Sequence, residues 1–168
     1  FDDIGTDGLV PQNYGGLDWS ASSWFAFSGE QAPYTPHSGD FRVTAGFGAS
    51  DADTTVHFGA GATFQGAWFA GFAEDFSGAP MTVTFELFNN GVQVGTSSAL
   101  ALSDTPTFLS SGYDGIVDTL IVSSGDQSLV TMDDFSFTQP VPEPETYALM
   151  LAGLGVVSFV ARRRNKAA

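Results

Sequence analysis

The sequence predicts an all-β body over residues 1–137, an antiparallel sandwich of two sheets of jelly-roll type. No stretch of residues 1–140 keeps a helical apolar period of about 3.6 residues over three turns. Short runs of β-branched and aromatic residues are instead separated by Gly, Ser, Asp and Pro, which end strands and form turns. The 20 glycines of the chain suit the many turns of a sandwich.

The clearest element is a β-hairpin over residues 81–98. Val83, Phe85 and Leu87 alternate with polar residues, which is the period of a strand with one buried face. Asn90-Gly91 follows, and this pair supplies the two positive φ angles that a type I′ turn needs. With the two strands of the hairpin we expect about nine in all, the others at 17–27, 41–47, 54–58, 62–72, 105–109, 116–123 and 128–137.

Charge divides the chain into two unlike parts. Residues 1–140 hold 17 acidic residues and one basic residue, Arg42, which gives a net charge of −16. Residues 141–168 hold two acidic and four basic residues, which gives +2. An acidic body repels phosphate backbones, so nucleic-acid binding is excluded as its function. The chain has no cysteine, which excludes disulfides and thiolate zinc sites.

The C-terminal part is typical of a short membrane anchor. We expect a transmembrane helix at 146–161, whose uncharged stretch Tyr147–Ala161 spans roughly 22 Å against a bilayer core of about 30 Å. A core helix would be amphipathic, whereas this stretch is apolar on every face. Basic residues follow at once and stay on the cytoplasmic side, which places the body outside and the tail 162–168 inside. They are Arg162, Arg163, Arg164 and Lys166.

Export of the body requires an N-terminal signal peptide. The chain starts at Phe1 without a methionine or an apolar leader, so we expect that a signal peptide has been removed. The linker 138–145 holds three prolines, which fix φ and disfavour a helix. We therefore expect an extended segment that a processing enzyme can bind.

The motif Pro142, Glu143 and Pro144, the apolar helix and the arginine-rich end together resemble the PEP-CTERM sorting signal, which is also described as an ice-binding-protein C-terminal motif. The resemblance covers only the tail. It implies processing by an exosortase, a membrane transpeptidase of Gram-negative bacteria. It also implies transfer from the inner membrane to the cell surface or to the extracellular matrix of a biofilm. Such tails occur on unrelated bodies, so the signal indicates a destination and not an activity.

The body shows a second resemblance. It opens with Phe1–Asp3, continues with the Val-Pro…Tyr-Gly-Gly-Leu-x-Trp segment Val10–Trp19, and closes with the Met-Asp-Asp-Phe segment Met132–Phe135. These segments are similar to those of bacterial extracellular β-sandwich domains that often precede PEP-CTERM tails. The general pattern is similar to galactose-binding and carbohydrate-binding jelly rolls, and it names no ligand.

Two acidic pairs, Asp2-Asp3 and Asp133-Asp134, stand near the ends of the body. The first and last strands of a jelly roll commonly pair, which would bring these carboxylates together with almost no base to neutralise them. Carboxylate oxygens suit Ca²⁺, and domains of the kind that the body resembles often hold calcium near their termini. Because neighbouring side chains of a strand point to opposite faces, we expect Asp3 and Asp133 to be the ligands. The alternative is that these carboxylates simply face solvent.

Aromatic residues gather in the Gly- and Ser-rich region 12–34. Flat rings suit the C–H faces of pyranose sugars, so this region predicts a ligand-binding patch, with core packing as the alternative. Its rings are Tyr14, Trp19, Trp24 and Tyr34.

Other candidate sites are weaker. The spacing of His37 and His57 does not place them on one face of one element, which disfavours a metal centre with Asp40. Residues 51–55 resemble the start of a calcium loop but lack its turn glycine and acidic closure, so we expect a surface loop. No G-x-S-x-G motif is present.

Two functions remain for the body. The first is a non-catalytic binding or structural module of the extracellular polysaccharide matrix, with calcium as a candidate stabilising ion. The second is a secreted hydrolase that acts on matrix glycans, for which nothing singles out a carboxylate pair. An ice-binding surface would need a flat, regular array of threonines, which the body lacks. We expect no enzymatic activity.

Overall fold

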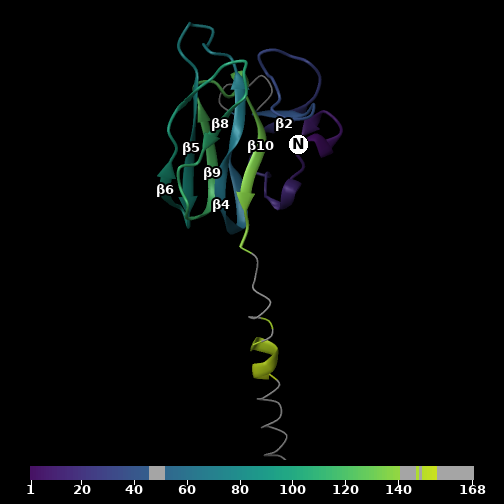
Figure 1. Ribbon diagram of the computed structural model, residues 1–168, viewed down its shortest axis with the longest axis vertical. Helices are drawn as coiled ribbons and strands as arrows, with labels where there is room; N and C mark the ends of the chain where they lie inside the picture. The colour runs from purple at the N-terminus through teal and green to yellow at the C-terminus, as the bar shows by residue number, and fades with distance from the viewer. Residues whose placement is uncertain (46–51, 141–146, 148, 155–168) are drawn as a thin grey trace, which may run out of the picture.

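The protein folds as an antiparallel β-structure (Figure 1). The computed structural model describes residues 1–45, 52–140, 147 and 149–154. Within them lie ten strands, and three short 3-10 helices join them. The strands are β1 (Gly8–Leu9), β2 (Trp24–Phe27), β3 (Arg42–Ala45), β4 (Val56–Gly71), β5 (Thr82–Asn89), β6 (Val92–Thr96), β7 (Leu100–Ala101), β8 (Thr107–Ser110), β9 (Ile116–Ser124) and β10 (Val130–Thr138); the helices are η1 (Asp2–Ile4), η2 (Tyr14–Gly16) and η3 (Gln127–Leu129). The all-β prediction is confirmed, and jelly-roll connectivity stays a prediction.

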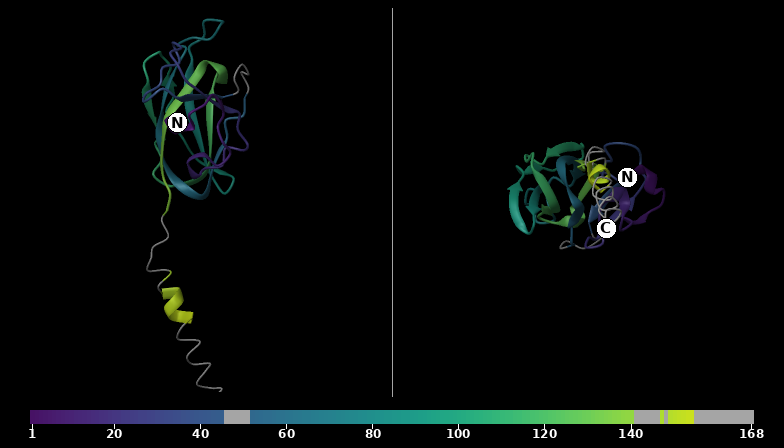
Figure 2. Two further views of the ribbon diagram at one scale, coloured as in Figure 1. Left: turned by 90° about the vertical axis from the view of Figure 1, so that its right-hand side faces the viewer. Right: turned by 90° about the horizontal axis from the view of Figure 1, so that it is seen from below.

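Strand β4 belongs to both halves of the sheet. The strand order is β1-β2-β3-β10-β4-β9-β5-β6, and β7 and β8 pair with β5 and β4. One edge of β4 pairs with β10, while the other edge pairs first with β9 and then with β8. Seen from below, the N-terminal third of the chain lies on one side of β4 and β10, and β5, β6 and β9 lie on the other (Figure 2).

Glycines in β4 let a single strand serve both halves. The sequence predicts separate strands at 54–58 and 62–72, but the structure joins them, because Gly59 and Gly61 take φ of 53° and 83° at a break in the register with β9. Such irregularities bend a strand without ending it. The predicted strand 17–27 is reduced to Trp24–Phe27, since a tight turn closed by the Ser22 N–H and the Trp19 oxygen interrupts the residues before it. The two-residue strands β1 and β7 have no sequence signal.

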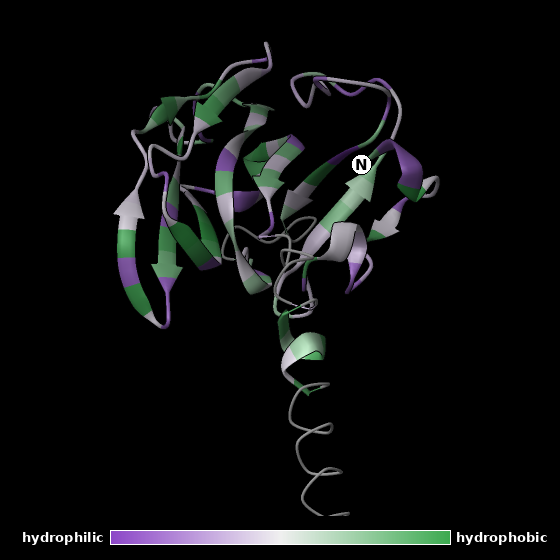
Figure 3. Ribbon diagram, turned by 60° about the horizontal axis from the view of Figure 1, so that its bottom comes forward, coloured by the Kyte–Doolittle hydropathy of each residue, from purple (hydrophilic) through white to green (hydrophobic). Residues whose placement is uncertain are grey.

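The hairpin of β5 and β6 is confirmed. Asn89 pairs with Val92, and Asn90 and Gly91 take φ of 52° and 73°, as a type I′ turn requires. Hydrophobic and hydrophilic residues alternate along it (Figure 3). Its inward side chains, Val83, Phe85 and Leu87, are fully buried. Each contributes about 1.5–3 kcal/mol of transfer free energy to a core that β2, β3, β4, β9 and β10 share.

Most of the predicted tail lies outside the described residues. This holds for the motif Pro142–Pro144, for Arg162–Lys166 and for much of the span 146–161, and Asp51 of the predicted surface loop also lies outside. Tyr147 and residues 149–154 are helical. In the part of the chain that the structure describes, no helix reaches the length and apolarity that a membrane crossing requires.

The turn of the hairpin yields a first prediction. Replacing Gly91 by Ala forces a Cβ into the left-handed region and should lower the free energy of unfolding by about 1 kcal/mol. Urea unfolding followed by circular dichroism measures this loss. Gly8→Ala is the matched control, because Gly8 has no positive φ and an added methyl group there would meet open space. Equal unfolding midpoints for the two variants would contradict the turn assignment.

Candidate functional site

A long connection covers the outward face of the first half of the sheet. Trp24, Val43 and Met132 point into the core, so their neighbours Phe27, Arg42 and Asp133 point to the opposite face. Residues 28–41, which we call the strap, run over this face between β2 and β3. Ring contacts hold the strap: Tyr34 meets Phe27 and Phe72 edge-on, and His37 stacks on Trp68 with ring centroids 3.5 Å apart.

Carboxylates fix the strap at three places along its length. At its start, Asp7 Oδ1 accepts hydrogen bonds from the backbone N–H and the hydroxyl of Ser28. In the middle, Asp133 Oδ2 accepts from the backbone N–H groups of His37 and Ser38 at 2.8 and 2.9 Å. At its end, Asp2 Oδ1 accepts from the N–H groups of residues 40 and 41.

Both members of the second acidic pair face the strap, which corrects the expectation from strand alternation. Asp134 takes φ of 43°, and the register between β10 and β4 shifts after Asp133. The irregularity turns Asp134 toward the same side as Asp133. Asp134 Oδ2 lies 2.6 Å from His37 Nδ1, and its Oδ1 accepts from the Ser38 hydroxyl. Asp133 is 3% exposed, and this burial raises its pKa.

The first acidic pair does not lie on a strand. Asp2 and Asp3 form η1, and β1 pairs with β2 rather than with β10, so the expected pairing of first and last strands is wrong. One member of each pair, Asp2 and Asp133, still binds backbone N–H groups of the strap, whereas Asp3 accepts from Tyr14. The N–H of Phe41, above all, lowers the pKa of Asp2. Among the described residues, no three His, Cys, Asp or Glu side chains are grouped so that they could hold a metal ion.

Arg42, the one basic residue of the body, is buried beneath the strap. It is 1% exposed, its guanidinium lies 4.1 Å from the centroid of the Phe27 ring, and Nη1 donates to the backbone oxygen of Asp40. Nε and Nη2 have no hydrogen-bond partner among the residues that the structure describes, and burial lowers the pKa of the guanidinium. In the described part of the chain, the carboxylate of Asp134 lies within ion-pair distance of His37. Arg42 has no carboxylate at such a distance among these residues.

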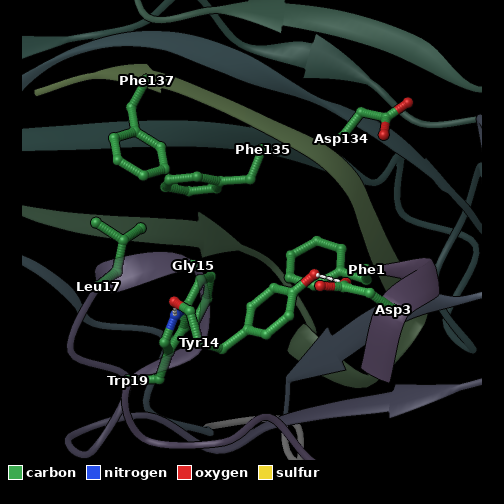
Figure 4. Close-up of a pocket in the computed structure, with 9 residues that line it drawn as sticks. All are labelled: Phe1, Asp3, Tyr14, Gly15, Leu17, Trp19, Asp134, Phe135 and Phe137. Carbon is green, nitrogen blue, oxygen red and sulfur yellow. Dashed lines mark hydrogen bonds between the residues drawn. The ribbon is translucent and has the colours of Figure 1, made fainter. Parts of the chain in front are cut away.

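An aromatic pocket of about 220 Å³ opens between the end of β10 and the segment 14–19 (Figure 4). Asp3 and Asp134 both line it, but the carboxylate that lies at the rings is that of Asp3, whereas the carboxylate of Asp134 points away from them (Figure 4). We call it the aromatic pocket after the rings that line it: Phe1, Tyr14, Trp19, Phe135 and Phe137.

The wall of the aromatic pocket is held rigidly. Tyr14 stacks on Phe1 with centroids 5.4 Å apart, and its hydroxyl donates to Asp3 Oδ1. This hydrogen bond lowers the pKa of Asp3, whereas burial and Asp3 raise the pKa of Tyr14. The indole N–H of Trp19 donates to the backbone oxygen of Tyr14 at 2.9 Å. Near neutral pH the pocket thus offers a neutral phenol beside an ionised carboxylate.

The predicted residues divide among several places. Tyr14, Trp19 and Asp3 meet in the aromatic pocket, whereas Asp133 lies under the strap. Trp24 is 1% exposed in the core with its indole N–H directed to Thr54, so it cannot be an exposed platform. Tyr34 belongs to the strap, and His57 contacts Thr119 on β9, away from His37. Phe135 and Phe137 had no sequence signal as site residues, because their alternation is typical of any strand.

The carboxylate at the end of the strap yields a pH-dependent prediction. The folded pKa of Asp2 is lowered, so its stabilisation is present above the ordinary value of 3.8 and is lost as pH falls through the folded pKa. Asp2→Asn should therefore lower the melting temperature by a few degrees at neutral pH, and the difference from wild type should shrink as the pH falls below 3.8. Asp114→Asn, at an exposed site, is the control. A difference that persists unchanged in acid would contradict the role of Asp2.

Comparison with known proteins supports the prediction of a sorting signal in the C-terminal tail. No curated protein matches the chain. A family model described as the PEP-CTERM protein-sorting motif matches residues 140–164, which include Pro142, Glu143 and Pro144 and the three arginines. The chain therefore carries a PEP-CTERM sorting motif at residues 140–164, and this motif implies export, a membrane-anchored precursor, processing by an exosortase-type enzyme and sorting to the cell surface.

Proposed function

We propose that the body is a non-catalytic carbohydrate-binding module, which the sorting signal delivers to the extracellular polysaccharide matrix of a Gram-negative bacterium. The body would lie in the periplasm while the precursor is anchored in the inner membrane. The observation that carries the proposal is the aromatic pocket, where the half-buried ring of Tyr14 lies beside the Asp3 carboxylate and the buried Trp19 forms part of the wall.

The chemistry of the aromatic pocket suits one pyranose ring. Aromatic faces pack against the C–H face of a sugar, and carboxylates accept hydrogen bonds from its hydroxyl groups. A volume of about 220 Å³ is below the roughly 300–1,000 Å³ of sites for drug-sized ligands, so it favours a single sugar unit. Because Tyr14 is fixed by Phe1 and Asp3, its ring needs little ordering on binding.

Charge supports a neutral glycan. Residues 1–140 carry a net charge of −16, and Arg42 is buried, so an acidic polysaccharide would be repelled. A neutral polymer avoids this repulsion and can still bind the carboxylates through its hydroxyl groups. We therefore propose neutral hexopyranose polymers as the ligand class.

A glycan array and titration calorimetry test the proposal. Tyr14→Ala removes the stacking ring and should weaken binding of neutral oligosaccharides about tenfold, or roughly 1.4 kcal/mol. Tyr14→Phe keeps the ring but loses the bond to Asp3, and should weaken binding less. Phe108→Ala removes an exposed ring outside the pocket and is the control. Equal affinities of Tyr14→Ala and wild type would reject the aromatic pocket, and release of new reducing ends would favour a hydrolase.

Calcium at Asp3 and Asp133 stays a prediction. It requires a melting temperature that rises with added Ca²⁺ and falls with chelator, which differential scanning calorimetry measures. The backbone N–H groups of the strap already bind Asp133. An unchanged melting temperature would therefore contradict the calcium prediction, and these N–H groups would be the partners that hold Asp133 in place.

A further inference from the structure

We propose that the body has a second carbohydrate site at the opposite end of β10, so that one copy bridges two glycan chains; this inference rests on the proposed function. The second site is a hollow of about 200 Å³, which we call the distal hollow. Residues from the strap, from β2 and β3, from the loop between β4 and β5, and from η3 line it. They include Phe27, Gln31, Tyr34, Thr44, Phe76 and Ser128.

The rings of the distal hollow are held in place by their neighbours. The Tyr34 hydroxyl donates to the backbone oxygen of Ser128 at 2.8 Å, and its ring meets Phe27 and Phe72 edge-on. The other lining groups are an exposed amide, Gln31, two hydroxyl side chains and the apolar Leu129, none of which carries a charge. This combination of fixed rings and uncharged polar groups suits a neutral sugar.

Phe76 is presented to solvent on a rigid loop. Its side chain is 87% exposed, the most of any large hydrophobic residue in the described chain. The preceding residue, Asp75, fixes the loop, because its Oδ1 accepts from the N–H and hydroxyl of Ser77 and from the N–H of Ala79 at 2.7–2.9 Å. The loop is thus ordered in advance around an exposed ring, which lowers the entropic cost of binding a ligand.

A path for a polymer continues beyond the distal hollow. A wider, open hollow of about 560 Å³ is lined by Pro33, which precedes Tyr34 in the strap, and by Phe72, Ser103 and Asp104. Phe72 joins the two hollows, since its ring contacts both Tyr34 and Phe76. A glycan chain can therefore pass from one hollow to the next, which a single small metabolite would not require.

The distal hollow is too far from the aromatic pocket for one sugar unit to occupy both. Ser128 lies just before β10, whereas Phe135 and Phe137 lie near its end. Six to eight residues of strand separate Leu129 from these rings, or roughly 20–26 Å. The loop that carries Phe76 projects at the end of the body opposite to that where β10 leads into residue 140 (Figure 1). Two sites so placed can engage separate chains.

Calorimetry with neutral hexasaccharides (cello-, laminari- and mannohexaose) tests the second site. Wild type should bind two molecules of the hexasaccharide that it recognises. Phe76→Ala and Tyr14→Ala should each weaken one of the two sites about tenfold, and the double variant should weaken both. Phe76→Tyr keeps the ring and should retain both sites. Val92→Ala, which is 64% exposed on β6, is the matched control.

Bridging has its own readout, the turbidity and viscosity of a soluble polysaccharide with the same linkage. Wild type should raise both, whereas Phe76→Ala should bind the polymer without raising either. One site per wild-type molecule, lost in Tyr14→Ala and unaffected in Phe76→Ala, overturns the second site and leaves the proposed function intact. One site that depends on Phe76 alone overturns the proposed role of the aromatic pocket and the bridging with it. Absence of binding to all three hexasaccharides overturns both.

Discussion

Backbone N–H groups must satisfy the carboxylates of this body, because 17 acidic residues are accompanied by a single arginine. The strap shows how this constraint shapes the molecule. Asp7, Asp133 and Asp2 bind its start, middle and end through main-chain donors, so a segment without regular secondary structure is fixed against the sheet. Charge-assisted hydrogen bonds of this kind are stronger than neutral ones. An excess of acid, which would otherwise oppose folding, thereby becomes the means of ordering residues 28–41.

Asp134 connects the strap with the aromatic pocket. Its carboxylate contacts His37 and Ser38 of the strap, and the same residue lines the aromatic pocket. The irregularity in β10 makes this double role possible, since a regular strand would direct Asp133 and Asp134 to opposite faces. After this irregularity, the next residue, Phe135, points toward the aromatic pocket, where its ring contacts those of Trp19 and Phe64.

Sequence patterns predicted the structural features that neighbouring residues determine, and missed the features that contacts between distant residues determine. The hairpin of β5 and β6 was predictable because Asn90-Gly91 and the alternation around Val83 are local signals. The continuity of β4 was not, because glycines at 59 and 61 are equally typical of a turn. Trp24 and Tyr14 look alike in sequence, yet one is in the core and the other at a pocket, since pairing with β3 decides the face of Trp24. The sorting motif needed no fold to be identified, because an enzyme reads it as a linear signal.

The burial of Arg42 also determines how neighbouring copies of the protein interact. Since the sole lysine or arginine of residues 1–140 is 1% exposed, the exterior of the body offers no such side chain to the acidic surface of a neighbour. Copies at the cell surface therefore repel one another as colloidal polyanions, over a range of about 8 Å at physiological ionic strength. The counter-ions that accompany them draw in water by osmosis. Copies crowded together would therefore stay hydrated and apart, at a spacing that shrinks as salt screens their charge.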